Sequence, residues 1–146
     1  MKRAVLSLAG TMLVLVGCGT EQTDEQTGED HMNGEDVTAE VEANGENGDL
    51  HILITLNNQS SETVDLTFRS GHQFDVRIYD EDDEKLYDFA EGMMFTEALI
   101  EEQIGAGDSL TFEDVWESYS GDYGPLLIET EVLADEFELK AETVYP

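Results

Sequence analysis

Apolar and polar residues alternate along most of the chain from residue 36 onward. In residues 50–56, for example, a leucine or isoleucine occupies every even position. A strand with this period buries one face and exposes the other, and no segment shows the sustained period of a long helix. Similar runs cover residues 37–42, 64–68, 74–79, 109–116, 126–133 and 137–144. The pattern predicts one all-β domain, an antiparallel β-sandwich of about eight or nine strands over residues 36–146.

Two connections in this pattern have more than one interpretation. The first run ends at the turn-forming residues 44–48, so the second run either pairs with it as a hairpin or crosses to the other sheet. Residues 92–103 fit a strand as well as one face of a helix, because their apolar residues satisfy both periods. A short apolar stretch at residues 86–89 follows the acidic residues 80–84 and predicts one further strand.

The first 17 residues have the composition of an export signal. Lys2 and Arg3 precede an apolar run, residues 4–16, that is too short to span a bilayer as a helix. The run ends in Leu-Val-Gly before Cys18, the only cysteine, and this order resembles the lipobox of bacterial lipoproteins, whose cysteine carries a diacylglycerol. The alternative is a free thiol behind a hydrophobic leader. We predict a lipoprotein signal peptide over residues 1–17 and an extracytoplasmic protein anchored to the cell membrane by lipidated Cys18.

The residues between this cysteine and the first strand are polar. Residues 19–35 contain six acidic residues, no basic residue and almost no apolar side chain. Such a segment buries too little surface to offset the entropy that folding would cost. We therefore predict that residues 18–35 form a lipidated cysteine and a flexible, disordered acidic linker that tethers the folded domain, residues 36–146.

The middle of the chain resembles a known family. Asn58, Gln59 and Ser60 follow a predicted strand, and the order and spacing of the matching residues hold from about residue 50 to 116. The other matching residues are Phe68, Gly71, Phe74, Tyr79, Asp80, Met94, Phe95, Thr96, Ala98, Gly107, Phe112, Asp114, Val115 and Trp116. In these residues the chain is similar to the BsuPI-type intracellular proteinase inhibitors of bacilli.

The resemblance implies an immunoglobulin-like sandwich and a strand within residues 92–103. It also implies a protein that binds a protease without catalysis or a cofactor. The family's name implies a cytoplasmic target, whereas residues 1–18 predict export. Either the target is a secreted or envelope protease, or the fold has been reused for another partner.

Acidic residues far outnumber basic ones. The chain has 35 Asp and Glu against 6 Lys and Arg, and six of these acids and two of these bases precede residue 36. The predicted domain keeps 29 acids and four bases, a formal charge of −25. This balance argues against nucleic acid as a partner, because phosphates bind clustered Lys and Arg. The acids are spread over nearly every strand and loop, which favours adaptation to saline or alkaline surroundings. The alternative is an acidic face for a cationic ligand or a basic partner protein.

Residues that carry chemistry in other proteins are scattered in this one. His31, His51 and His72 have no second histidine or cysteine at metal-ligand spacing, and no glycine-flanked nucleophile is present. The five consecutive acids, residues 80–84, fit either a calcium loop or a solvated turn, and the spacing lacks the glycine and distal glutamate of an EF-hand. We predict no catalytic residue, no metal site and no cofactor.

Apolar residues that the strands leave unused are candidates for partner binding. Met93, Met94 and Phe95 follow Gly92, and they either pack onto the end of the sandwich or form a patch for a partner. Trp116 ends a predicted strand, where core packing is the commoner role and a binding anchor is the alternative. We take Met93, Met94 and Phe95 as the candidate interaction loop.

These features predict a membrane-tethered, non-catalytic protein-binding module. On the family resemblance, its partner is a subtilisin-like serine protease whose cleft is filled by a loop of a rigid sandwich. The alternative is an envelope lipoprotein that binds another surface protein or a small ligand with no protease involved. A hydrolase is the least favoured class, because carboxylate pairs are too common in so acidic a chain to indicate a site.

Overall fold

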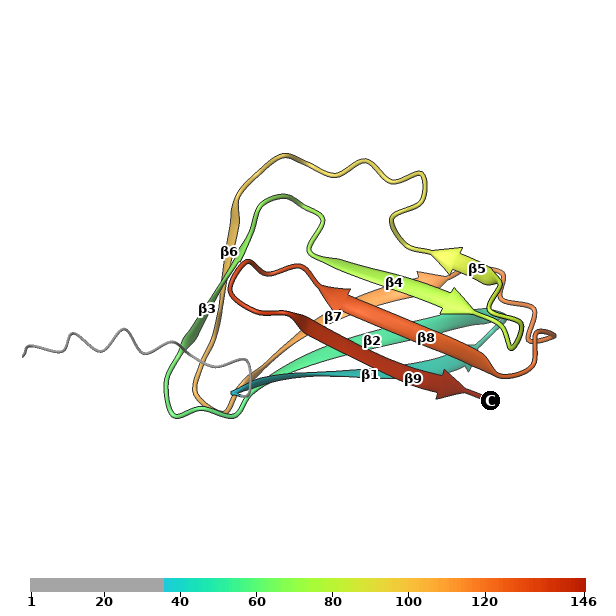
Figure 1. Ribbon diagram of the computed structural model, residues 1–146, viewed down its shortest axis with the longest axis horizontal. Helices are drawn as coiled ribbons and strands as arrows, with labels where there is room; N and C mark the ends of the chain where they lie inside the picture. Colours follow the sequence, from blue (N-terminus) through green and yellow to red (C-terminus); the bar gives the residue numbers. More distant parts are fainter. Residues whose placement is uncertain (1–35) are drawn as a thin grey trace, which may run out of the picture. The chain divides into compact units, whose positions relative to one another are not determined.

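The computed structural model describes residues 36–146, and all of the regular structure in this part of the chain is β (Figure 1). The signal peptide, the lipidated Cys18 and the linker predicted for residues 1–35 lie outside the described residues. The strands are β1 (Val37–Glu46), β2 (Asp49–Asn58), β3 (Val64–Phe68), β4 (Phe74–Tyr79), β5 (Lys85–Asp88), β6 (Ile100–Ile104), β7 (Ser109–Trp116), β8 (Leu126–Val132) and β9 (Leu139–Tyr145). The prediction of an all-β domain is confirmed.

The strands form three antiparallel sheets. One has the order β1-β2-β7, the second has the order β5-β4-β8-β9, and β3 pairs with β6 in a separate ribbon. Strands adjacent in a sheet are thus often distant in sequence, as expected of the crossovers between the two layers of an immunoglobulin-like sandwich. Residues 36–146 contain no helix that is long and apolar enough to cross a membrane.

The first two strands form a hairpin, which resolves one of the open connections. Their register runs from Val37 opposite Asn58 to Glu46 opposite Asp49. The turn is Asn47-Gly48, and both residues have positive φ, 56° and 89°. Two positive φ values in a two-residue loop match the twist of the strands it joins. The first strand therefore extends to Glu46, beyond the end expected from the turn-forming residues 44–48.

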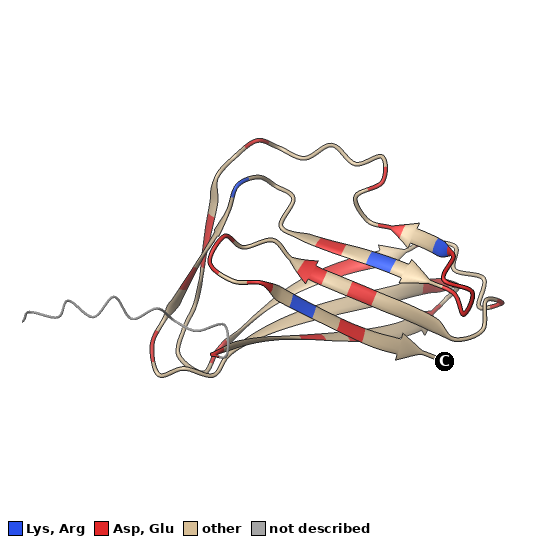
Figure 2. Cartoon of the chain, in the orientation of Figure 1, with Lys and Arg blue, Asp and Glu red and all other residues tan. Residues whose placement is uncertain are grey.

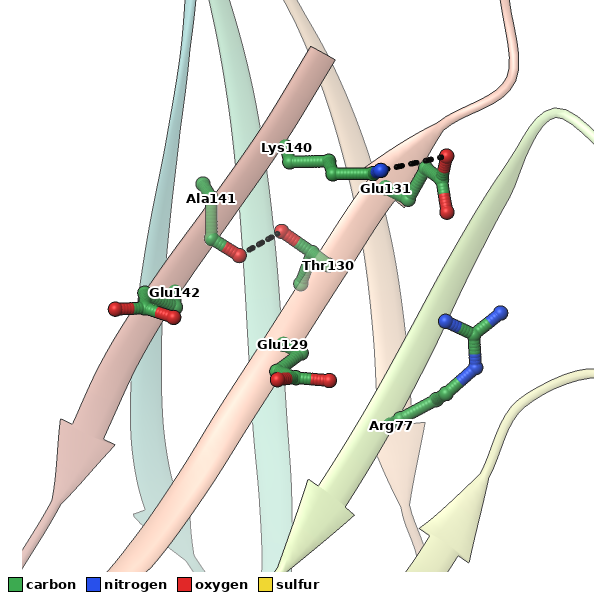
Figure 3. A pocket seen from close by; sticks show the side chains of 7 residues that line it. All are labelled: Arg77, Glu129, Thr130, Glu131, Lys140, Ala141 and Glu142. Carbon is green, nitrogen blue, oxygen red and sulfur yellow. Dashed lines mark hydrogen bonds and ion pairs between the residues drawn. The ribbon is translucent and has the colours of Figure 1, made fainter. Parts of the chain in front are cut away.

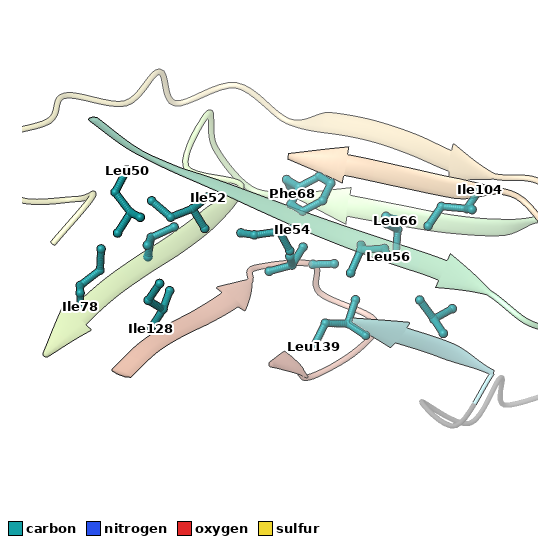
Figure 4. Close-up of a cluster of buried hydrophobic side chains, with 14 of the residues drawn as sticks. Leu50, Ile52, Ile54, Leu56, Leu66, Phe68, Ile78, Ile104, Ile128 and Leu139 are labelled. Atoms are coloured by element: carbon teal, nitrogen blue, oxygen red, sulfur yellow. The ribbon is translucent and has the colours of Figure 1, made fainter. Parts of the chain in front are cut away.

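The core lies between the sheets and is built from the alternating apolar residues of the strands (Figure 4). Strand β2 contributes Leu50, Ile52, Ile54 and Leu56, all essentially inaccessible to solvent. They pack in one cluster with residues of β3, β4 and β8, including Phe68, Ile78 and Ile128. Burial of a branched or aromatic side chain stabilises a fold by roughly 1.5–3 kcal/mol, so this cluster is the main source of stability.

Residues 92–103 differ from both expectations. None of them is helical, and only the end of the segment belongs to a strand, β6. The preceding residues form an irregular connection from β5, so the family-based expectation of a strand is correct only from Ile100 onward. Contacts with other parts of the domain, described below, determine the positions of the apolar residues in this connection. Neither a helix period nor a strand period does so.

A buried asparagine joins two connections at one end of the sandwich, the one between β2 and β3 and the one between β6 and β7. The Asn58 side chain donates to the carbonyls of Glu62 (2.7 Å) and Ile104 (2.9 Å), and its Oδ1 accepts from the Ser60 backbone at 3.0 Å. Its backbone exchanges two further bonds with Gly107 and Asp108. A buried amide is costly unless bonded, and here the bonds fix the loops on either side of β3 and β6.

Candidate functional site

The long connection between β5 and β6, residues 89–99, carries the most exposed apolar side chains of the described residues. We call it the binding loop. Met94 is 96% exposed, Met93 52% and Leu99 66%. Three other large hydrophobic side chains among residues 36–146 are exposed: Val144 at 65%, Tyr123 at 42% and Val115 at 37%. Met93 and Met94, which were selected from the sequence, lie on this protruding loop between β5 and β6 (Figure 1).

Phe95 has a different role from its two neighbours. Its ring stacks on the imidazole of His72, with 4.1 Å between ring centroids and an angle of 5° between planes. The ring of Phe89, at the start of the loop, stacks on Phe74 at 4.5 Å and lies 5.9 Å from Phe95. We call His72, Phe74, Phe89 and Phe95 the loop cluster. The ring of Phe95 is half-buried against the domain, so this residue packs onto the sandwich, and its part in binding a partner stays a prediction.

Charged groups hold the histidine under the binding loop in place. His72 Nε2 lies 2.6 Å from one carboxylate oxygen of Asp75, and Arg77 Nη2 donates to the other at 2.9 Å. Asp75 is only 7% exposed, so both of its oxygens are bonded in a site with little water. Hydrogen bonds to a carboxylate in such a site are among the stronger ones in proteins. The ring on which Phe95 stacks is therefore fixed from below.

The backbone of the binding loop is also bonded at both ends. Gly71 N–H donates to the Thr96 carbonyl at 2.8 Å, and a Cβ at Gly71 would lie 2.6 Å from Thr96 Oγ1, so only glycine fits there without a shift. At the start of the loop, Ala90 N–H donates to Asp88 Oδ1 at 3.1 Å. The Lys85 ammonium, 2.7 Å from the other oxygen of Asp88, is the main cause of a lowered pKa of Asp88. The tip between these attachments is Gly92, Met93 and Met94.

This arrangement combines an exposed apolar tip with a fixed base. It presents two flexible, unbranched apolar side chains on a tip whose base is packed and hydrogen-bonded. Methionine adapts its shape to an apolar pocket, and a preorganised loop loses little entropy on binding. Within residues 36–146, no three His, Cys, Asp or Glu side chains are grouped as metal ligands.

A second aromatic group surrounds the tryptophan. Trp116 is half-buried against the core, and its ring stacks on Tyr87 and Tyr123 at 5.6 and 5.5 Å. Tyr119 lies 5.3 Å from Trp116, and Tyr145 meets Tyr119 edge-on at 6.0 Å. We call these five residues the end cluster. Trp116 packs against the core, as the core interpretation predicted. Tyr123 is the exposed residue of the end cluster.

A carboxylate lies beneath the end cluster. Tyr87 Oη donates to Asp114 Oδ2 at 2.9 Å. Burial raises the pKa of the Asp114 carboxyl, and burial together with the Asp114 charge raises the pKa of the Tyr87 hydroxyl. Both shifts favour the neutral groups, as expected where water is excluded. The pair links β5 to β7 below Trp116.

The outer face of the four-stranded sheet forms a shallow polar groove of about 480 Å³ (Figure 3). Glu129 and Glu142 lie opposite each other on β8 and β9. The two bases of the groove already have partners: Lys140 lies 3.7 Å from Glu131, and Arg77 bonds Asp75 outside the groove. The groove is a charged sheet surface, and its side chains suggest no reaction.

The acidic run at residues 80–84 forms the turn between β4 and β5. Asp80 Oδ1 accepts hydrogen bonds from the backbone N–H groups of Asp82 and Glu84, both at 2.9 Å, and Asp83 has a φ of 61°. Aspartate commonly closes turns in this way. The turn interpretation of this run therefore describes its structure. Acidic residues are distributed over the other strands and loops as well (Figure 2).

Sequence reasoning missed the residues that position the binding loop. His72 and Thr96 have no periodic signal, since their contacts with Phe95 and Gly71 join segments distant in the chain. Asp75 lies within the strand run 74–79, but that pattern does not indicate its bond to His72. The one local hint is the spacing of His72 and Asp75 on either side of an apolar strand residue. His51 lies exposed on the outer face of β2, away from this site, and His31 lies outside the described residues.

Comparison with known proteins gives a family match. Residues 36–140 match the family model described as "BsuPI: Intracellular proteinase inhibitor". No curated protein matches the chain. Solved structures that match the chain include the solution structure of R. palustris CsgH, 14% identical over 73% of this chain and 89% of that one, with a TM-score of 0.39. Another is a DUF1425 family member from Shewanella sp., 14% identical over 75% of each chain, with a TM-score of 0.37.

Proposed function

The chain belongs to the BsuPI family of intracellular proteinase inhibitors, and we propose on that premise that it is a non-catalytic module that binds a protease through the binding loop. The observation that carries the proposal is the exposure of Met93 and Met94 on a segment whose base is docked on His72. A subtilisin-like serine protease is the proposed partner, and its cleft would receive the loop tip.

The physical case rests on preorganisation. Pre-organised protein complexes change little on binding and typically bury about 1,600 Å² in total. The stacked Phe95 ring and the Gly71 to Thr96 bond keep the loop in one conformation before the partner arrives. The acidic remainder of the domain keeps a protein with an exposed apolar tip soluble.

The test is a titration of the purified protein against a panel of secreted and intracellular subtilisin-like serine proteases at high salt. The expected result is stoichiometric loss of protease activity without consumption of the inhibitor. Met94→Ala should weaken inhibition about tenfold or more if the side chain is a hot spot. Val144→Ala, an equally simple change at a residue 65% exposed on β9, is the matched control and should have no effect. Unaltered activity of every protease at a large molar excess would remove the inhibitor proposal and leave a module that binds another envelope protein or a ligand.

Anchoring is a second part of the proposal, supported by the sequence of residues 1–18. Two acyl chains on Cys18 would hold the domain stably at a membrane, whereas one chain alone gives marginal binding. Mass spectrometry of the membrane fraction should find the acylated N-terminal cysteine, and Cys18→Ala should not be processed to a lipid-modified form. Wild-type protein without acyl groups would end this part of the proposal.

Adaptation to salt is the third part, supported by the formal charge of −25 on residues 36–146. Mutual repulsion of the acids destabilises the compact state, and molar salt shortens the Debye length to about 3 Å. The thermal unfolding midpoint should therefore rise steeply between low and molar potassium chloride. A midpoint that is flat or falls with salt would contradict the adaptation and favour a local use of the acids.

A further inference from the structure

We propose that the end of the sandwich formed by the connection between β7 and β8, residues 117–125, and by the acidic turn, residues 80–84, is a second protein-binding surface. Its partner presents arginine and lysine side chains. We call this region the end surface. The proposal is independent of the binding loop and of protease inhibition. It starts from the exposed aromatic ring of the end cluster and from the charges that surround this ring.

The composition of the connection is unusual for a simple link between strands. Residues 118–124 read Ser-Tyr-Ser-Gly-Asp-Tyr-Gly. Tyrosine, serine and glycine dominate the loops with which antibodies bind proteins, because tyrosine offers a large rigid contact area and the small residues adapt around it. The two tyrosines of this connection differ in burial. Tyr119 is 7% exposed and packs in the end cluster, whereas Tyr123 is 42% exposed.

The exposed ring is held by its neighbours. Tyr123 stacks on Trp116 at 5.5 Å and on Tyr119 at 6.1 Å, with interplanar angles of 29° and 21°. The Ser118 N–H donates to Asp49 Oδ1 at 2.8 Å and fixes the start of the connection. Positive φ values at Ser118, Gly121 and Gly124 give it a compact path. The outer face of the Tyr123 ring is therefore offered to a partner at a small entropic cost.

The charges near this ring determine the chemistry of the partner. The acidic turn adjoins the connection, since a Cβ at Gly124 would lie 3.6 Å from Glu81 Oε2. Asp122 belongs to the connection itself, and Figure 2 shows the turn as a continuous acidic segment. The nearest base, Lys85, is bonded to Asp88 and does not neutralise the turn. A guanidinium or ammonium group can stack on an aromatic face and bond to a carboxylate at once.

The end surface includes the closed end of the first hairpin. The chain enters β1 at the opposite end, where the Asp36 carbonyl accepts from Gln59 N–H at 2.7 Å. The turn of the first hairpin lies at the end surface, and residues 45–49 and 119–121 line a shallow hollow of about 200 Å³ there. The hollow gives the partner a depression beside the exposed ring.

The experiment uses the purified full chain and a dodecapeptide of alternating arginine and glycine as the probe. Lysine-glycine and glutamate-glycine peptides serve as comparisons, and binding is followed by calorimetry and by the fluorescence of Trp116. Because Trp116 is the only tryptophan, its fluorescence reports on this end of the domain alone. The arginine peptide should bind most tightly, the lysine peptide less tightly, and the glutamate peptide should not bind.

Two matched comparisons separate a built surface from the general acidity of the protein. Tyr123→Ser should weaken binding of the arginine peptide about fivefold, a typical loss for one cation–π contact, whereas Val144→Ser on β9 should not change it. Neutralising Glu81 and Asp122 as Gln and Asn should weaken binding more than neutralising two distant exposed acids, Glu40→Gln and Glu101→Gln. Met94→Ala should leave binding unchanged, which separates this surface from the binding loop.

Three results would overturn the proposal. Equal losses from the two pairs of neutralised acids would show that only total charge matters. Full binding by Tyr123→Ser would remove the exposed ring from the surface. The third result uses a neutral oligosaccharide, maltohexaose. If it binds in a way that depends on Tyr123 and the arginine peptide does not bind, the exposed ring is a carbohydrate-binding surface instead.

Discussion

The loop cluster and the end cluster use aromatic residues in two different ways. In the loop cluster, phenylalanine rings and His72 pack under a segment whose own exposed side chains are methionines. In the end cluster, tyrosines pack around Trp116, and one of them, Tyr123, is itself the exposed side chain. The loop cluster supports the binding loop from below. The end cluster supports its connection and also exposes one of its own rings. Tyrosine suits the second role because its ring packs while its hydroxyl stays in water.

The difference has a structural origin in β5. Tyr87 in this strand faces Trp116, and Phe89, two residues later, faces Phe74 and the binding loop. Strand β5 thus contributes to the end cluster, and the first residue after it contributes to the loop cluster. Tyr87 bonds Asp114 on β7, whereas Asp88 bonds Lys85 within β5 itself. Substitutions in the two clusters should accordingly differ in how much of the domain they affect.

Trp116→Ala should have the largest effect on stability. The ring packs against the core and against three tyrosines, and truncation of a buried aromatic residue typically costs about 3–5 kcal/mol, a large share of the stability of a small domain. The free energy of unfolding, measured by circular dichroism in urea, should fall by an amount near the lower value because the ring is half-buried. Trp116→Phe is the control and should lose less. An unchanged unfolding midpoint would show that the end cluster is only a surface feature.

Phe95→Ala should have a smaller effect that is confined to the binding loop. We expect a loss of about 1–2 kcal/mol, within the usual range for a half-buried side chain, and faster cleavage of residues 89–99 by a nonspecific protease. Met94→Ala, one residue away and almost fully exposed, should change stability by less than about 0.5 kcal/mol and leave the cleavage rate unchanged. Equal cleavage of the two variants would mean that Phe95 does not hold the loop.

The strands were predictable because their period is local. Leu50, Ile52 and Ile54 alternate in the sequence and lie in the core in the structure. The turn at Asn47-Gly48 was also predictable, since few other residues adopt positive φ twice in succession. The length of the first strand was not predictable. Asn44 and Gly45 are residue types common in turns, and only their pairing with His51 and Leu50 shows that they belong to the strand.

The binding loop was predictable only in part, for a physical reason. Exposure of Met93 and Met94 follows from their position beyond the strands, whereas the burial of Phe95 depends on His72, which is distant in sequence. No local pattern distinguishes an aromatic ring that packs from one that binds. Leu99, in the segment that fits both a strand and a helix period, is also exposed.

The smallest predicted effect concerns Asp114, whose carboxyl pKa is raised from its ordinary value by burial. A raised carboxyl pKa means that the folded state binds the proton more tightly than the unfolded state. Stability from this group is therefore complete below the ordinary pKa and is lost as the pH rises through the folded value.

Asp114→Asn removes the titration but keeps an acceptor for the Tyr87 hydroxyl. The unfolding midpoint of this variant, relative to wild type, should therefore increase with pH from about 3 upward. Glu113→Gln, the exposed neighbour on β7, removes the same unit of charge and should give a difference that does not change in this way. Parallel curves for Asp114→Asn and wild type would show that the end cluster admits enough water for Asp114 to titrate as an ordinary surface carboxylate.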